Sequence, residues 1–198
     1  MRLTPWLIAA VMLFVLWRLY SQRDIEHPRG VLVAADPVQR DLSDALPVKR
    51  GEFTLRPRAD FSATVRILHS EGYSRGSLAT LVPTDFAVGW GPMSDSAVLA
   101  HIQISQSNRF YYWRTADWPI SREQIETHSA NWHVIPGNAA VQRTLGTLRT
   151  GSVVRLSGQL VDVEGREGSM NTSLRRDDTG AGACEILLAG SAQVIDTR

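Results

Sequence analysis

The chain has 198 residues, of which 43% are hydrophobic and 21% charged, and these ordinary globular values exclude wholesale disorder and a polytopic membrane protein. The 21 lysines and arginines nearly cancel the 20 aspartates and glutamates, and a net charge of +1 gives no basic footprint for a nucleic-acid partner. Cys184 is the single cysteine, which excludes an internal disulfide and a cysteine-rich zinc motif.

An apolar segment at the N-terminus predicts a membrane anchor. Residues 5–20 carry one charge, and Trp6, Trp17 and Tyr20 flank the run as interfacial aromatic residues do. Because the run lacks the small residues that precede a signal-peptide cut, residues 1–22 are predicted to remain as a signal anchor in the lipid bilayer. The short N-terminal tail favours a domain on the outer, periplasmic face, with the cytoplasmic face as the alternative.

The next segment, residues 23–58, is predicted to be a tether between the bilayer and one globular domain at residues 59–198. Four prolines at spacings of about ten residues break helices and favour extended chain: Pro28, Pro37, Pro47 and Pro57. As an alternative, short apolar patches such as residues 31–33 lie along the domain surface.

The first half of the domain mixes strands with one short helix. Apolar residues alternate with polar ones over residues 61–67, the period of a half-buried strand. Residues 94–101 are predicted to form a short helix. Residues 102–105 and 110–114 form a strand pair that turns at Ser107 and Asn108.

Two further helices carry clear start signals. Ser121 and Gln124 match a capping box that opens a helix over residues 121–128. Asn138 is the expected N-cap of a helix over residues 139–149.

The second half of the domain is predicted to be mostly strand. Apolar residues from 154 to 160 share one face, and Val161 and Val163 continue on the opposite parity, as a bulge near Gly158 would produce. A helix followed by a long bent strand and hairpins resembles the back half of an OB-type barrel. The expected fold is therefore strand-rich α+β: one compact domain with a partly OB-like β-barrel and two or three short helices, behind an N-terminal transmembrane helix.

A G-x-S-x-G pattern centred on Ser74 resembles the nucleophile elbow of hydrolases, and Asp85 or Asp95 followed by His101 gives the matching residue order. The segment after Ser74 is too short for the required helix, and the domain is too poor in βαβ units. A surface turn is the favoured interpretation.

The densest polar motif is HSANWH, residues 128–133. His128, His133 and Cys184, with Asp177 as a further donor, provide the ligand types that zinc prefers, so zinc is the alternative cofactor. A spacing of five residues, however, points the two imidazoles apart on a helix and on a strand. The competing interpretation places His128 at a helix end and His133 at the start of a strand.

Aromatic residues concentrate between residues 90 and 132, where one face of a strand could form an exposed platform for a ligand. Together with the polar motif they define the candidate ligand-binding residues: Trp90, Tyr111, Trp113, His128, Asn131, Trp132 and His133.

The sequence resembles uncharacterised bacterial proteins with a single N-terminal membrane anchor and an HSANxHxIP-type motif. The resemblance lies in four segments, at residues 89–99, 104–114, 128–136 and 178–185. This resemblance implies a location in the bacterial envelope and carries no activity or site with it.

Two functions follow as hypotheses. The first is a membrane-tethered envelope domain of non-catalytic binding or assembly type, without a cofactor, whose partner is an envelope protein or a small ligand. The alternative is a small metal-dependent hydrolase that uses His128 and His133.

Overall fold

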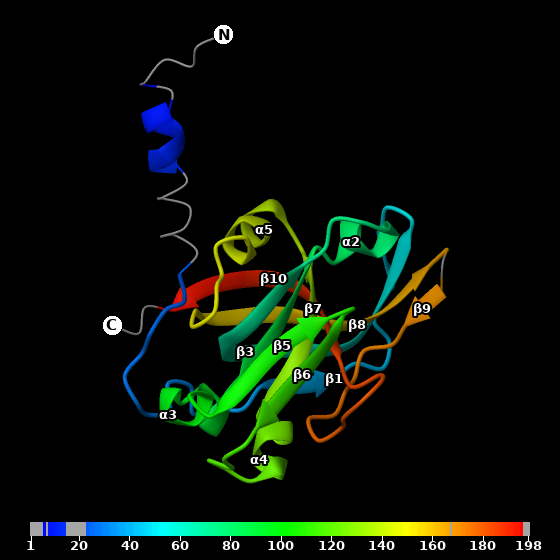
Figure 1. Ribbon diagram of the computed structural model, residues 1–198. Helices are drawn as coiled ribbons and strands as arrows, with labels where there is room; N and C mark the ends of the chain where they lie inside the picture. Colours follow the sequence, from blue (N-terminus) through cyan, green and yellow to red (C-terminus); the bar gives the residue numbers. More distant parts are fainter. Residues whose placement is uncertain (1–5, 7, 15–22, 167, 196–198) are drawn as a thin grey trace.

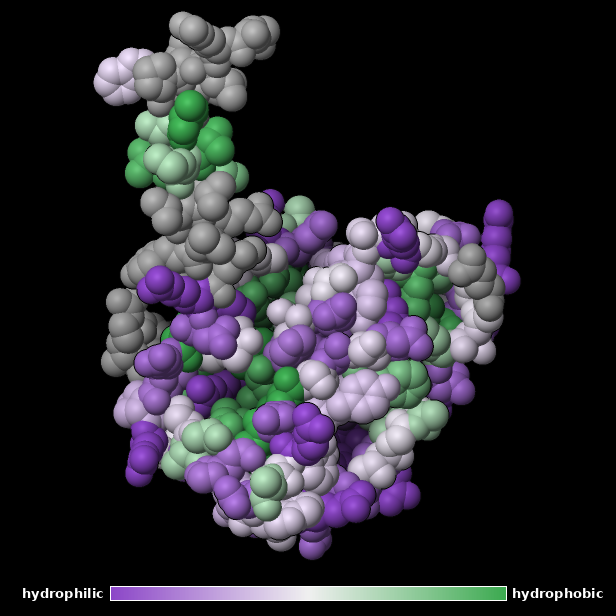
Figure 2. Space-filling view, in the orientation of Figure 1, coloured by the Kyte–Doolittle hydropathy of each residue, from purple (hydrophilic) through white to green (hydrophobic). Residues whose placement is uncertain are grey.

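A computed structural model of the chain describes residues 6, 8–14, 23–166 and 168–195. Much of the predicted anchor lies outside these residues; residues 8–14 are helical, and their apolar side chains are on the surface in Figure 2. Of the helices described, none combines the length and the apolar character needed to cross a bilayer.

The domain is a strand-rich α+β unit built on a mixed, partly ringed sheet (Figure 1). Five strands pair in the order β3–β4–β7–β10–β8, and β8 pairs back with β3. All of these pairings are antiparallel except the parallel pair β7–β10. The strands are β3 (Phe53–Gly72), β4 (Thr84–Gly89), β7 (Ser129–Pro136), β8 (Val153–Gly165) and β10 (Glu185–Ile195).

The alternation predicted for residues 61–67 is confirmed within β3, where every second side chain from Phe53 to Ile67 is buried. The register of β3 shifts between Pro57 and Ala59 against β8, and between Ile67 and His69 against β4. Such bulges bend a strand and increase its twist, so one 20-residue strand can pair along several sides of the ring.

The predicted phase switch in β8 is also present, since Leu160 and Val161 are both buried. The compensating shift lies in its partner β3, directly opposite this pair. Gly158 has a separate role: a Cβ at this position would collide with the Leu188 carbonyl, so glycine permits the close approach of β10.

The interior of the ring holds the main hydrophobic core. Trp132 and Phe61 meet edge to face at its centre, with ring centroids 5.3 Å apart. Strands on every side contribute the remaining core side chains, which include Val65, Phe86, Val88, Val134, Val154, Leu156, Leu160 and Leu187.

A separate hairpin of β5 (Ile102–Ser107) and β6 (Phe110–Thr115) lies in front of the ring in Figure 1. Its turn residues Asn108 and Arg109 both have positive φ, 51° and 66°, as in a type I′ hairpin turn. A second apolar cluster packs beneath the hairpin and contains Leu68, Ala87, Met93, Ile102 and Ile125.

The helices are short. The capping box of Ser121 and Gln124 is confirmed at α4 (Arg122–Thr127), and Asn138 accepts from the Val141 N–H at the start of α5. Both helices end earlier than predicted. Beyond the helical residues 8–14, the helices of the described chain are α2 (Ser77–Leu81), the 3-10 helix η1 (Gly91–Ser94), α3 (Ser96–Leu99), α4 and α5 (Ala139–Leu145).

Part of the predicted tether packs on the domain. Within it, the strands β1 (Val38–Asp41) and β2 (Val48–Arg50) pair with β3. The later strand β9 (Gly168–Met170), outside the tether, extends β8 at another edge of the sheet. Val33 is buried in the main core, and its carbonyl accepts from the Gly91 N–H at 2.7 Å. These contacts favour the alternative in which the short apolar patches lie along the domain, and residue 59 falls inside β3.

Replacing Val33 with alanine should lower the free energy of unfolding by about 2 kcal/mol, because two buried methyl groups are lost and a cavity remains. Val31→Ala is the matched control, since Val31 is 50% exposed and Val33 is 5% exposed. Urea denaturation of both variants measures the difference. Equal effects would show that Val33 does not contribute to the core.

Candidate functional site

Polar side chains line the outer face of the ring beneath the hairpin. Strand alternation explains this placement, because Phe86 and Trp132 enter the core while Asp85, Asn131 and His133 point the opposite way. All three are buried, at 0%, 4% and 3% exposure. The hairpin thus covers a polar layer that the sheet alone would expose to water.

Asp85 is the centre of this layer. Its Oδ1 atom lies 2.9 Å from Arg109 Nη1 of the hairpin turn and 2.9 Å from His133 Nδ1 of the neighbouring strand. The direction of the His133 contact departs from hydrogen-bond geometry, and Asp85 Oδ2 has no hydrogen-bond partner among the described residues. A buried carboxylate needs such cationic neighbours, because its own desolvation is costly.

His133 lies on the same outer face as Cys184. Ile186 pairs with His133 across the parallel β7–β10 ladder, so Cys184, two residues earlier, falls on this face. Burial alone would lower the pKa of His133, but interaction with the Asp85 carboxylate and with Cys184 raises it to about 9. The imidazole therefore lies beside a buried carboxylate and at the same cavity as a thiol.

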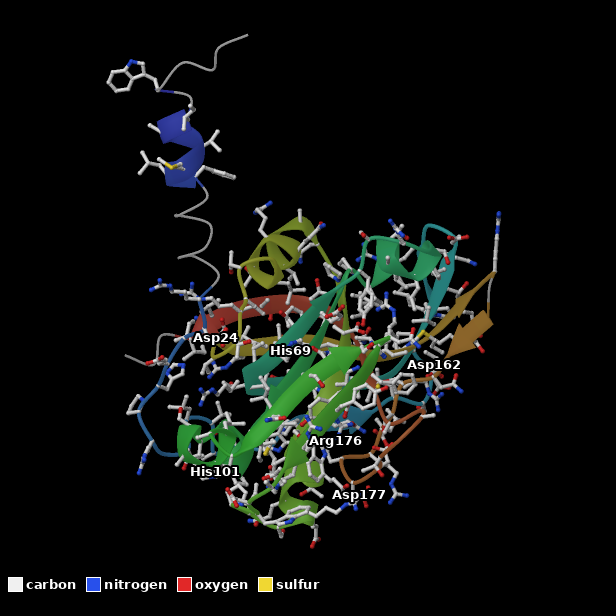
Figure 3. All side chains as sticks on the ribbon, viewed as in Figure 1. Asp24, His69, His101, Asp162, Arg176 and Asp177 are labelled. Carbon is white, nitrogen blue, oxygen red and sulfur yellow. The ribbon has the colours of Figure 1, made fainter. Side chains whose placement is uncertain are left out.

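Asn131 connects the thiol to the rest of the polar layer. Its Nδ2 atom lies 3.6 Å from Cys184 Sγ and donates to the Arg109 carbonyl at 3.0 Å. Its Oδ1 atom accepts from Gln106 Nε2 at 2.6 Å, and Gln106 Oε1 lies 3.0 Å from His69 Nδ1. Figure 3 labels His69 on β3. This chain of contacts spans strands β3, β5 and β7 and fixes the amide of Asn131.

Arg109 occupies a backbone conformation that a non-glycine residue adopts only when its surroundings require it. Its N–H donates to the Tyr73 hydroxyl at 2.9 Å, and its guanidinium lies 3.9 Å from the centre of the Tyr73 ring. The same group donates to the Val82 carbonyl at 3.1 Å. These contacts, with the Asp85 ion pair, hold the hairpin turn against the ring.

A cavity of about 290 Å³ opens beside these groups. Phe110, Met170, Ala181 and Ile186 form an apolar part of its wall, and Cys184 and His133 are also exposed to it. Arg109 completes the wall at the hairpin turn. The cavity therefore combines apolar walls with a few convergent polar groups, the usual character of a small-molecule site.

A second buried acid lies beside this layer. Glu185 is 2% exposed and forms an ion pair with Arg176, whose guanidinium lies over the Phe61 ring. Burial raises the pKa of Glu185 to about 7, against the opposing effect of Arg176. The charge of His133 lowers the pKa of Glu185, as the charge of Arg176 does. His133 therefore interacts electrostatically with both buried acids, Asp85 and Glu185.

The four residues considered for zinc do not meet in one place. His133 and Cys184 line one cavity, but His128 lies at the end of α4, where its ring is 6.3 Å from that of Trp90. Asp177 lies on the exposed loop labelled in Figure 3 and pairs with Arg175 through two contacts of 2.9 Å. Within the described ranges no group of three His, Cys, Asp or Glu side chains has a metal-binding arrangement.

The aromatic candidates divide between the core and the hairpin. Trp90 and Trp132 are 1% and 0% exposed and belong to the main core. Tyr111 donates to the Ser129 hydroxyl at 3.1 Å, and burial raises the pKa of Tyr111 to about 12. Trp113 packs edge to face on Trp118. Of the predicted ligand-binding residues, His133 reaches the cavity directly and Asn131 contacts its thiol.

The elbow residues are dispersed. The helix after Ser74 is the five-residue α2, Asp95 caps α3, and His101 lies 3.8 Å from Asp117 at the opposite end of the hairpin. Asp85 does contact a histidine, but that residue is His133. Sequence reasoning missed the roles of Asp85 and Arg109, although an acid within an otherwise apolar strand is a usable signal.

Comparison of the chain with protein-family models, curated proteins and solved structures found no match. The site therefore has to be interpreted from its own geometry.

Replacing Arg109 with glutamine should lower the free energy of unfolding by about 3 kcal/mol, because a buried carboxylate loses one of its two cationic partners. Arg175→Gln is the control; it breaks the exposed pair with Asp177 and should leave stability nearly unchanged. Chemical denaturation monitors both variants. If Arg109→Gln lowers the free energy of unfolding as little as Arg175→Gln does, the Asp85 ion pair does not have a central role.

The stability of the domain should depend on pH through His133. Because its pKa rises from 6.5 to about 9 on folding, the native state binds more protons than the unfolded chain between these values. The stabilisation is complete below pH 6.5 and is lost as the pH rises through 9. His133→Gln should flatten this decline in the free energy of unfolding, while the exposed-site variant His101→Gln should retain it.

Proposed function

We propose that the chain is a membrane-tethered envelope domain that binds a small ligand in the cavity between the hairpin, β7 and the loop before β10. The observation that carries the proposal is the position of this cavity on the ring. It lies on the outer face of β7 and β10, between the turn of the hairpin and the loop that precedes β10.

The strand order supports an OB-type barrel. Numbered along the chain, the ring strands β3, β4, β7, β8 and β10 are strands one to five. They pair in the order one, two, three, five, four and back to one, and strands three and five are parallel. Helix α5 lies between the third and fourth strands. OB-type barrels bind their ligands on the face of strands two and three and on the loops after strands one and four. The cavity shares two of these parts, strand three through His133 and the loop after strand four through Ala181 and Cys184.

The size and lining of the cavity favour a small, largely apolar ligand group. A volume of about 290 Å³ is at the lower end of the roughly 300–1,000 Å³ typical of small-molecule pockets. Arg109 offers a cationic group at one side, with 17% of its side chain exposed. A near-neutral total charge favours such a ligand over a nucleic acid.

The proposed tether rests on the apolar N-terminal segment. Within residues 8–14, five large apolar side chains are 48–67% exposed: Ile8, Val11, Met12, Leu13 and Phe14. A helix with such a surface is expected to be covered by lipid or protein. The bacterial-envelope resemblance and the short N-terminal tail favour the periplasmic face for the domain.

Nuclear magnetic resonance of the ¹⁵N-labelled full chain in detergent micelles, titrated with a library of small organic compounds, tests this proposal. Compounds that bind should shift the amide signals of Phe110, Met170 and Ala181 together. Ala181→Trp should abolish these shifts because the indole fills the cavity, whereas Ala100→Trp, on the exposed end of α3, should preserve them.

A different pattern of shifts would contradict the proposal. A larger hollow of about 610 Å³ lies between α2 and the β2–β3 turn, with Phe53, Leu81 and Ile135 in its wall. Shifts confined to that hollow, or shifts at Ala181 that persist in Ala181→Trp, would place binding elsewhere.

A further inference from the structure

The cavity contains a nucleophile in a setting that favours reaction. Cys184 is half-buried and lines the same cavity as the imidazole of His133. A thiol that is partly exposed beside a basic or cationic group is the reactive type, whereas a thiol enclosed by apolar side chains is inert. The surroundings of Cys184 belong to the first type.

The neighbours of Cys184 form an ordered series. His133 Nδ1 lies 2.9 Å from Asp85 Oδ1, so the other ring nitrogen, Nε2, is directed away from that carboxylate. Asp85 is itself held by Arg109. A nucleophile, a histidine at the same cavity and a third group that orients the histidine resemble the arrangement used in nucleophilic catalysis.

We propose that the ligand is an acyl group carried as a thioester, and that Cys184 captures it covalently. The inference rests on the proposed function, because it assigns a chemical class to the ligand of the same cavity. The sulfur of Cys184 bonds to the acyl carbon, and the bond from that carbon to the leaving sulfur breaks. The protonated imidazole of His133 donates a proton to the leaving thiolate and regains one from the proton that the Cys184 thiol releases, so the products are S-acyl Cys184 and a free thiol.

The surrounding residues fit this step. Asn131 Nδ2, 3.6 Å from Sγ, is a donor beside the point where negative charge develops on the acyl oxygen. Phe110, Met170 and Ile186 provide an apolar surface for a short acyl chain. Asp85 acts as a positioning residue, since it contacts the imidazole and not the reacting atoms.

The experiment uses two acetyl donors on the full chain in detergent: p-nitrophenyl acetate, whose leaving group needs no proton, and S-ethyl thioacetate, whose leaving group does. Mass spectrometry of the peptide containing Cys184 measures acetylation with time. Wild type should react with S-ethyl thioacetate at least roughly tenfold faster than N-acetylcysteine at the same pH. Cys184→Ala should form no adduct at this peptide.

The variants distinguish a loss of proton transfer from a structural defect. His133→Gln and Asp85→Asn should slow the reaction with S-ethyl thioacetate more than the reaction with p-nitrophenyl acetate, because the proton for the leaving group is lost or misplaced. A merely structural defect would slow both donors equally. His101→Gln, at an exposed pair outside the cavity, should match wild type with both donors.

Wild type alone can overturn the inference, even where a variant fails to fold. A reaction with S-ethyl thioacetate no faster than that of N-acetylcysteine, or no faster than that of the same chain unfolded in urea, would reject acyl capture. Ligand-induced shifts at Phe110 and Ala181 without acylation would leave the proposed binding function intact. Rapid acylation that Ala181→Trp does not reduce would instead refute the cavity as the binding site.

Discussion

A carboxylate without solvent exposure, Asp85, is the group on which the arrangement of the site depends. Its charge must be balanced inside the protein, and the balancing groups come from two different elements: Arg109 of the hairpin and His133 of the sheet. This carboxylate therefore attaches the hairpin, helps to keep Arg109 in a left-handed conformation and positions the imidazole of His133. Burial would be unfavourable for an isolated carboxylate, and here it requires Arg109 and His133 to lie against Asp85.

The ring gives this polar layer a rigid support. Side chains of β4 and β7 alternate between an apolar interior and a polar exterior, so the core that holds the strands also fixes the positions of Asp85 and His133. The parallel pairing of β10 with β7 brings Cys184 beside Asn131, although 53 positions separate them in the sequence. A site on strands is held more closely than one on loops.

The sequence predicts the local elements well and the long-range contacts poorly. The alternation in β3, the capping box at Ser121 and the phase change after Leu160 are local patterns, and all three are present in the structure. The polar motif at residues 128–133 is visible in the sequence, but the partner of His133 is not, because the pairing of Asp85 with His133 depends on strand register. For the same reason the packing of residues 23–58 on the domain was only an alternative.

The loop between β9 and β10 supplies Ala181 and Cys184 to the cavity wall, while the imidazole of His133 and the carboxylate of Asp85 lie on ring strands. The variable part of the wall and the buried polar pair thus belong to separate segments of the chain. Substitutions, insertions or deletions in this surface loop could change the shape of the cavity at little cost to the core. Evolution could reshape the cavity by varying this one loop, with Asp85 and His133 left unaltered.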